Sequence, residues 1–131
     1  MLLHVTILYG TLLCLVTLLL AVNISLYRLY KGVYIGMEVP KRLNRYIRAH
    51  GNSAEWLAVV IFPLAFLELQ GAPSLWLHLA GGSLLATRVL HAIFMMTGAR
   101  VAGIFASTIS ATLMYLAAFA AALGALWLRL R

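Results

Sequence analysis

Three polar side chains, Arg48, Asn52 and Glu55, stand at the start of a long apolar segment. In a helix, residues four and seven positions apart project from one face, so these three would place a cation, an amide and a carboxylate side by side. The chain continues from Leu57 to Leu67 without a charged residue, as membrane-spanning helices do. Ionisable groups in such a helix are costly and usually face a partner, a cavity or a ligand. The spacing therefore predicts a binding or catalytic site.

A second polar pair, Arg88 and His91, lies three residues apart on a later apolar segment. If the two segments are antiparallel neighbours, Glu55 lies roughly 10 Å along its helix from Arg48, and Arg88 lies roughly 12 Å along its helix from Met96, at about 1.5 Å per residue. The two opposite charges then reach about the same depth in the membrane. Either charge would cost at least ~2.5 kcal/mol if it were unpaired at the centre of a bilayer. We therefore predict a structural ion pair between Glu55 and Arg88, with His91 near Asn52.

Such a cluster has the chemistry to hold a small zwitterionic peptide with more than one carboxylate. Arginine binds carboxylates through paired hydrogen bonds, and Arg28, Arg45 and Arg48 all lie in or beside this region of the sequence. Asn52 and Glu55 could bind an amine or an amide of the same ligand. The structural alternative is a polar clamp that only fixes helix packing, because membrane helices also associate through polar groups.

The composition identifies the elements that must hold these residues. Of 131 residues, 64% are hydrophobic and 10% are charged, whereas soluble proteins average about 25% charged residues. Four segments, at about 2–27, 44–69, 74–96 and 102–128, are long enough to cross a bilayer, which takes about 20 residues. We predict an all-α integral membrane protein, a four-helix bundle that forms one domain over residues 1–131.

Basic residues concentrate in the loop between the first two segments and at its edges: Arg28, Lys31, Lys41, Arg42, Arg45 and Arg48. The positive-inside rule places this loop in the cytoplasm and both termini outside. In a soluble protein the net charge of +7 would suggest a nucleic-acid partner, but membrane topology accounts for it here. We therefore expect membrane lipid, and no nucleic acid, as a partner. The first segment has no basic residue ahead of it, which favours an uncleaved spanning helix over a signal peptide.

Other residues give weaker indications of a site. Cys14 is the single cysteine, so no disulfide can form within the chain, and we expect no metal site. A haem would need two converging histidines, for which His50 and His91 are the candidates. Glu68, near the outer end of its segment, is expected to be a solvated carboxylate. A small four-helix drug exporter would need a carboxylate in the first segment, and residues 2–27 contain none.

The motif Arg-x-x-x-Asn-x-x-Glu that begins at Arg48, followed by an apolar helix containing Pro63, resembles the MAPEG family. These are the membrane-associated proteins of eicosanoid and glutathione metabolism. Arg88 and His91 are similar to the family's signature in its third helix, and the four helices, the long basic first loop and the length agree across essentially the whole chain. The chain looks most like small bacterial members.

The resemblance implies a homotrimer in a bacterial inner membrane, with glutathione as co-substrate between neighbouring subunits near the cytoplasmic face. In active members, a glutathione thiolate attacks a lipophilic electrophile or peroxide, as in microsomal-type glutathione transferases. Matching positions assign five residues to the glutathione pocket: Arg28, Arg48, Asn52, Glu55 and His91. Arg100, just before the fourth helix, would be catalytic, because a nearby cation lowers the pKa of a thiol.

Three positions depart from the family pattern. Gly51 stands where a second arginine often precedes the motif asparagine, and Met95 stands where a tyrosine is expected. Arg100 lies a few residues away from the position of the thiolate-stabilising arginine. These departures motivate an alternative, a non-catalytic membrane binding or accessory protein with the same fold. The enzyme should show glutathione-dependent conjugation that falls sharply in Arg100→Ala, and the accessory protein should show none.

Overall fold

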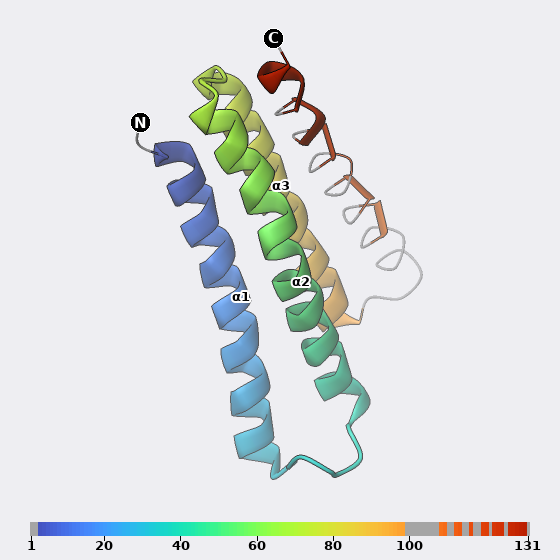
Figure 1. Ribbon diagram of the computed structural model, residues 1–131. Coiled ribbons are helices and arrows are strands. Elements are labelled where there is room, and N and C mark those ends of the chain that lie inside the picture. The colour runs from blue at the N-terminus through green and yellow to red at the C-terminus, as the bar shows by residue number, and fades with distance from the viewer. Residues whose placement is uncertain are drawn as a thin grey trace.

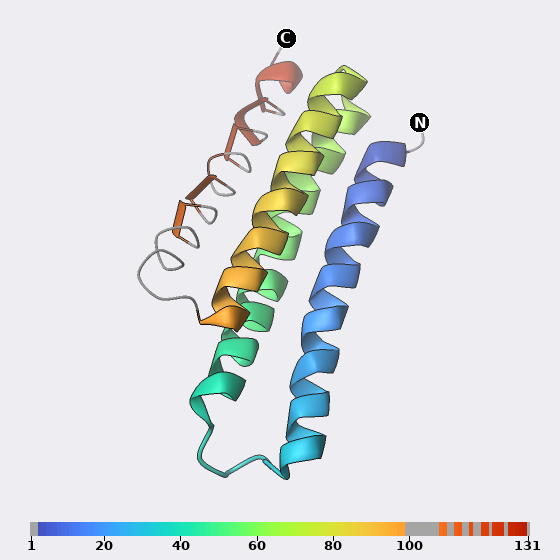
Figure 2. The same ribbon diagram turned by 180° about the vertical axis from the view of Figure 1, so that it is seen from behind.

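A computed structural model describes residues 3–98 and, in the C-terminal segment, residues 108–109, 112–113, 116, 119–120, 122–124 and 126–130. The continuous part contains three helices, α1 (His4–Lys31), α2 (Lys41–Leu69) and α3 (Ser74–Thr97). They pack side by side, with α2 antiparallel to the other two (Figures 1 and 2). No strand occurs in the described ranges, so the all-α prediction is confirmed there, while a complete fourth helix over 102–128 stays a prediction.

Two helices extend further into the α1–α2 loop region than hydropathy alone predicted. The first helix extends to Lys31, where Gly32 adopts a left-handed conformation (φ 61°) that closes the helix. The Gly32 and Val33 N–H groups both donate to the Arg28 carbonyl, the latter at 3.1 Å, as is typical of a helix end closed by a left-handed glycine. The second helix begins directly after Pro40, whose φ of −56° suits a helix start. Helices therefore continue past the apolar core into the polar region.

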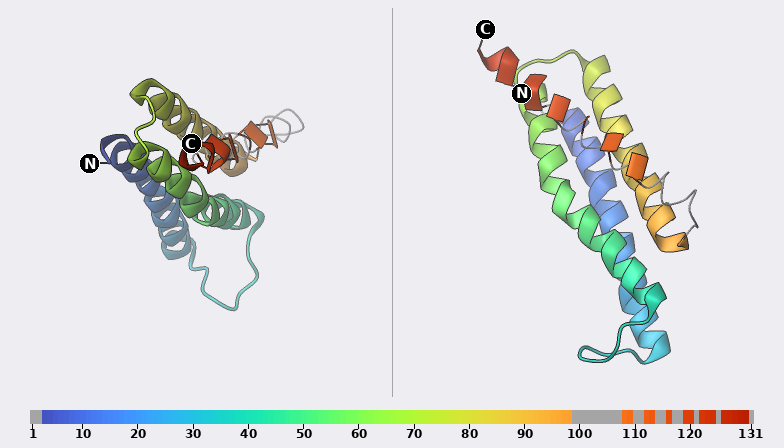
Figure 3. Two further views of the ribbon diagram at one scale, coloured as in Figure 1. Left: turned by 45° about the horizontal axis from the view of Figure 1, so that its top comes forward. Right: turned by 90° about the vertical axis from the view of Figure 1, so that its right-hand side faces the viewer.

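All three helices are long and apolar enough to cross a membrane. With 28, 29 and 24 residues, they measure about 42, 44 and 36 Å, against about 30 Å for a hydrocarbon core. The end that carries the α1–α2 loop extends beyond the last turn of α3 (Figure 3). The start of α1 and residues 126–130 lie at the other end (Figure 1).

The bundle core consists of three layers, and each layer takes one buried residue from each helix. From the end where α1 begins, the layers are Val5–Leu64–Leu77, Leu13–Val60–Leu84 and Leu20–Ala49–Ala92. Alanine in the third layer lets the helix backbones approach closely, as small residues do in membrane bundles. This close packing fixes the rotation of α2 and α3 about their axes.

A polar level lies between the second and third layers, with Thr17, Ser53 and Arg88 from the three helices. The Thr17 hydroxyl is 2.8 Å from the Ser53 hydroxyl and donates to the Leu13 carbonyl at 3.0 Å. Ser53 and Arg88 are 3% and 2% exposed. The structure thus holds a cation in the interior of the bundle, at the depth where the polar face of α2 begins.

Glu68 is not a solvated carboxylate, so that prediction was wrong. Its side chain is buried, and its two oxygens accept the Val5 N–H at 2.8 Å and the Thr6 N–H at 2.7 Å. The first N–H groups of a helix have no partner within the helix and carry the positive end of its dipole. A carboxylate at the end of α2 therefore caps the start of α1.

Near the same end of the bundle, the Tyr9 ring of α1 packs against the backbone of α3 at Gly81. A Cβ atom at Gly81 would overlap the ring, whereas a Cβ at Gly82 would make ordinary contacts with the Tyr9 hydroxyl, at 3.5 Å, and with Cε1 of Tyr9, at 4.0 Å. The Tyr9 hydroxyl also lies 3.2 Å from Nδ1 of His78. The glycine at position 81 is what lets α1 and α3 come together here.

Candidate functional site

A pocket of about 330 Å³ opens between the N-terminal half of α2 and the C-terminal half of α3. Its lining comes from seven residues: Ile47, Arg48, Gly51, Asn52, Glu55, His91 and Met95. Four of the five residues predicted to bind a ligand are therefore brought together. The volume lies at the lower end of the range of small-molecule sites, which is about 300–1,000 Å³.

The core packing of α2 explains why its polar residues face this pocket. Ala49 and Ser53 are buried in the bundle, which turns the opposite face outward. Arg48 and Glu55 are exposed in the single chain, and Asn52 is partly buried between them. The pocket thus has a cation and a carboxylate at its mouth and an amide deeper inside.

Gly51 widens the pocket on the α2 side. A Cβ atom built at Gly51 has nothing within 4 Å, so a longer side chain would project into open space at the pocket. Ile47 and Gly51 were not predicted as site residues. They lie four residues apart and on the Arg48–Glu55 side of the helix, so helical periodicity could have identified them as pocket residues.

Arg88 does not line the pocket but donates a hydrogen bond to Asn52, which does. Its Nη1 donates to Oδ1 of Asn52 at 2.5 Å, which occupies the amide oxygen and leaves the Asn52 NH₂ group as a donor. Asn52 lies about one turn before Glu55 on α2, and the Glu55–Arg88 ion pair stays a prediction. The buried guanidinium makes the wall of the pocket electropositive, because charges are weakly screened in a low-dielectric interior.

His91 lies one helical turn beyond Arg88 and lines the same pocket. The side chain is 6% exposed, and among the residues that the structure describes its Nδ1 has no hydrogen-bond partner. Most buried polar atoms are paired, so a buried nitrogen without a partner marks a place where another molecule can supply one. His91 therefore contributes to the pocket wall an imidazole whose buried Nδ1 is not used by the described residues.

The remaining predicted residues lie elsewhere. Arg28 occupies the last turn of α1, half-buried, and does not line this pocket. Arg100, the predicted catalytic residue, lies outside the described residues. Arg45 packs its guanidinium against Gly98, at the C-terminus of α3, where a cation is favourable. Met95 lines the pocket with a thioether, which has no proton to donate.

The chain matches known proteins over most of its length. The sequence model of the MAPEG family matches residues 6–130. The chain belongs to the MAPEG family. Inner membrane protein YecN of Escherichia coli K12 is 31% identical over 87 residues, which span 66% of this chain and 66% of YecN. YecN of Escherichia coli O6:H1, strain CFT073, matches to the same extent.

The relatives and the helices together identify this MAPEG protein as an integral inner membrane protein, consistent with a small bacterial member of the family. The polar motif on α2 and His91 on α3, which carried the resemblance, meet in the pocket, and Arg88, the other α3 residue of the resemblance, donates to Asn52 behind it. Sequence motif and spatial site therefore coincide.

Proposed function

We propose that this MAPEG protein binds glutathione in the pocket between α2 and α3 and uses it in a transferase or peroxidase reaction on lipophilic electrophiles. The observation that carries the proposal is the convergence of Arg48, Asn52, Glu55 and His91 on one pocket of about 330 Å³. Membership of a family of glutathione and eicosanoid metabolism supplies the ligand class.

The charges at the pocket match the functional groups of a zwitterionic peptide. Arg48 would pair with a carboxylate and Glu55 with the ammonium group. The Asn52 NH₂ group, held by its hydrogen bond from Arg88, would donate to a carbonyl or carboxylate oxygen. His91 would contact a polar group further inside. Each group of the ligand then meets a partner of complementary charge or hydrogen-bonding type.

The same proposal places the pocket near the cytoplasm and between subunits. The basic α1–α2 loop lies at the pocket end of the bundle and, by the positive-inside rule, faces the cytoplasm, with both termini outside (Figure 3). Arg48 and Glu55 are exposed in the single chain, so a neighbouring copy in a homotrimer would close the pocket. Arg28 would reach it from that neighbour.

The proposed transferase or peroxidase reaction requires the thiolate form of glutathione. Arg100 is the residue that we propose to stabilise this thiolate. A decrease in the thiol pKa from about 8.5 towards 7 raises the thiolate fraction severalfold at neutral pH. The sulfur then attacks an electrophilic carbon of a substrate that enters from the lipid. An S–C bond forms, and the leaving group departs with the electron pair of the broken bond.

Calorimetry of glutathione binding to the detergent-purified protein tests the site. Wild type should bind, and Arg48→Ala should lose about tenfold or more in affinity, because hydrogen bonds to charged groups contribute about 1.5–3 kcal/mol. Lys41→Ala removes the same charge from an exposed residue outside the pocket and should bind as wild type does. Absence of binding in wild type would refute the glutathione assignment, and equal losses in the two variants would refute the site.

A non-catalytic binding or accessory role is the second candidate, and the observation in its favour is Met95. A tyrosine there could donate a hydrogen bond to a thiolate, and a thioether cannot. Conjugation of glutathione to a chlorodinitrobenzene separates the two roles. The enzyme should turn over, with activity falling sharply in Arg100→Ala. Binding without turnover in wild type would establish the accessory role.

A further inference from the structure

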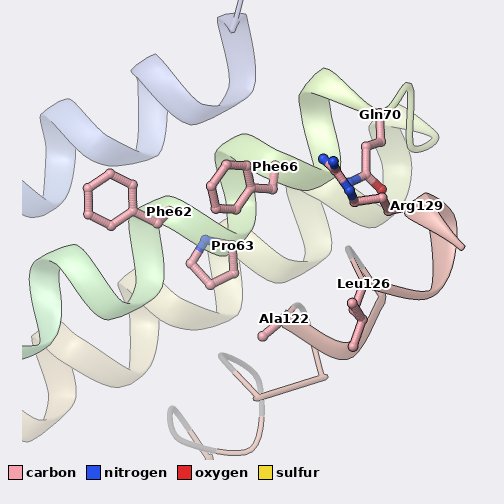
Figure 4. Close-up of a pocket in the computed structure, with 7 residues that line it drawn as sticks. All are labelled: Phe62, Pro63, Phe66, Gln70, Ala122, Leu126 and Arg129. Atoms are coloured by element: carbon pink, nitrogen blue, oxygen red, sulfur yellow. The ribbon is translucent and has the colours of Figure 1, made fainter.

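A second pocket of about 340 Å³ lies between the C-terminal half of α2 and described residues of the C-terminal segment (Figure 4). Five of its lining residues are apolar: Phe62, Pro63, Phe66, Ala122 and Leu126. The two polar ones are Gln70 and Arg129. Contact between the segments continues beside it, because a Cβ atom at Gly124 would lie 3.4 Å from the side chain of Leu67.

This pocket is separate from the proposed glutathione site. Phe62 and Gln70 lie seven and fifteen residues beyond Glu55 on the same helix, or about 10 and 22 Å along its axis. The second pocket is therefore at the end of the bundle where α1 begins and α2 ends. A molecule bound there would sit in the opposite leaflet from glutathione.

The pocket has a polar end and an apolar length. Gln70 and Arg129 lie together at one end of it, and the two phenylalanines and Leu126 extend away from them (Figure 4). Phe62 and Phe66 are 61% and 54% exposed, so the apolar part is open at its side. Pro63 has no N–H group and adds no donor to this part. Such a surface suits a hydrocarbon chain that ends in a polar headgroup.

The headgroup should be anionic, because Arg129 brings a positive charge to the polar end of the pocket and the acidic side chains of the chain are placed or engaged elsewhere. The chain has three acidic residues. Glu38 is in the loop at the opposite end, Glu55 lines the other pocket, and Glu68 is occupied by the two N–H groups of α1. A guanidinium binds a phosphate through two parallel hydrogen bonds, which gives it a preference over neutral groups.

We propose that this pocket binds an anionic phospholipid, with an acyl chain along Phe62, Phe66 and Leu126 and the headgroup phosphate at Arg129 and Gln70. This site does not depend on glutathione binding or on turnover. A basic residue near a membrane surface favours an anionic over a neutral lipid by about fivefold. Phosphatidylglycerol and phosphatidylcholine, with equal acyl chains, are therefore the matched probes.

Fluorescence of Trp127, which follows Leu126 in the chain, provides the readout. The full chain with Trp56→Phe and Trp76→Phe is reconstituted in brominated phosphatidylcholine, which quenches the remaining tryptophan. Unbrominated phosphatidylglycerol should relieve quenching about fivefold more effectively than unbrominated phosphatidylcholine. Arg129→Gln should reduce this ratio to about one, and Arg129→Lys should keep most of it. Arg131→Gln, which removes the same charge two residues later, should leave it unchanged.

Two results would overturn the proposal from this experiment: equal relief by both lipids in the parent chain, or equal losses in the Arg129 and Arg131 variants. Native mass spectrometry of the wild-type chain, with all tryptophans present, gives an independent measurement. Phosphatidylglycerol adducts should outnumber phosphatidylcholine adducts from an equal mixture, and equal numbers would contradict the proposal.

The competing occupant is a second copy of the chain. Phe66→Cys in a Cys14→Ser background should stay free of intermolecular disulfide under mild oxidation in vesicles, because lipid covers the pocket. Efficient formation of a disulfide-linked dimer would show that a second copy covers it and would overturn the lipid assignment.

Discussion

At the scale of single residues, Arg88 decides whether the polar cluster is a ligand site or only a clamp. Its guanidinium is buried, donates to Asn52 and does not itself line the pocket. A buried charge is expensive to desolvate, so an apolar replacement of similar length can leave stability nearly unchanged. Polar contacts between membrane helices average only about 0.6 kcal/mol. The contribution of Arg88 to stability is therefore expected to be smaller than its contribution to binding.

We expect the free energy of unfolding of Arg88→Met to lie within about 1 kcal/mol of the wild-type value. Its affinity for glutathione should fall severalfold, because the Asn52 amide loses its orientation. Arg88→Ala should also lose stability, by about 2 kcal/mol or more, because it leaves a cavity. Unfolding in a denaturing detergent and calorimetry measure the two effects. Unchanged affinity in Arg88→Met would contradict the positioning role and favour the clamp.

At the scale of helices, the α1–α2 contact depends on the capping carboxylate of Glu68. Loss of a helix cap costs about 0.5–2 kcal/mol, and buried groups left unpaired add about 1–3 kcal/mol. We expect Glu68→Ala to destabilise the protein by about 2 kcal/mol, and Glu68→Gln, which keeps one oxygen acceptor, by less. Glu38→Gln removes the same charge from the exposed loop and should unfold as wild type does. Equal stability of Glu68→Ala and wild type would contradict the cap.

The contact between α1 and α3 depends on a single glycine. Gly81→Ala would place a methyl group against the Tyr9 ring and should destabilise the bundle by about 1–3 kcal/mol, as overpacking does. Gly82→Ala meets only an ordinary contact and gains helix propensity, so it should be neutral or stabilising. The same unfolding assay compares the two neighbours, and equal effects would show that the Tyr9 contact is not specific.

Helical spacing explains why much of this site could be predicted. Arg48, Asn52 and Glu55 share a face of any helix, so the pocket lining on α2 follows from the sequence. Depth matching brought Arg88 to the level of the polar face of α2, but it did not predict the hydrogen bond from Arg88 to Asn52, which lies about one turn before Glu55. The role of Glu68 depends on which helix terminus lies beside it, and no local pattern contains that information.

At the scale of the whole molecule, the proposed homotrimer accounts for the open side of the glutathione pocket. Native mass spectrometry in a mild detergent should give three times the mass of the 14.4 kDa chain. Glutathione should add in steps up to three per trimer if each pocket is completed by a neighbour. A monomer that binds glutathione with full affinity would contradict a pocket shared between subunits.

The Glu68 cap also has a consequence for how the chain enters the membrane. The first turn of α1 is synthesised 63 and 62 residues before Glu68, counted from Val5 and Thr6, so its two leading N–H groups begin without their carboxylate. Only a second span inserted in the opposite direction brings Glu68 back to the starting side. A nascent chain with a misoriented second span would leave that first turn uncapped and frayed. The Glu68 carboxylate thus stabilises the correctly inserted chain during biosynthesis, before any ligand or partner subunit is present.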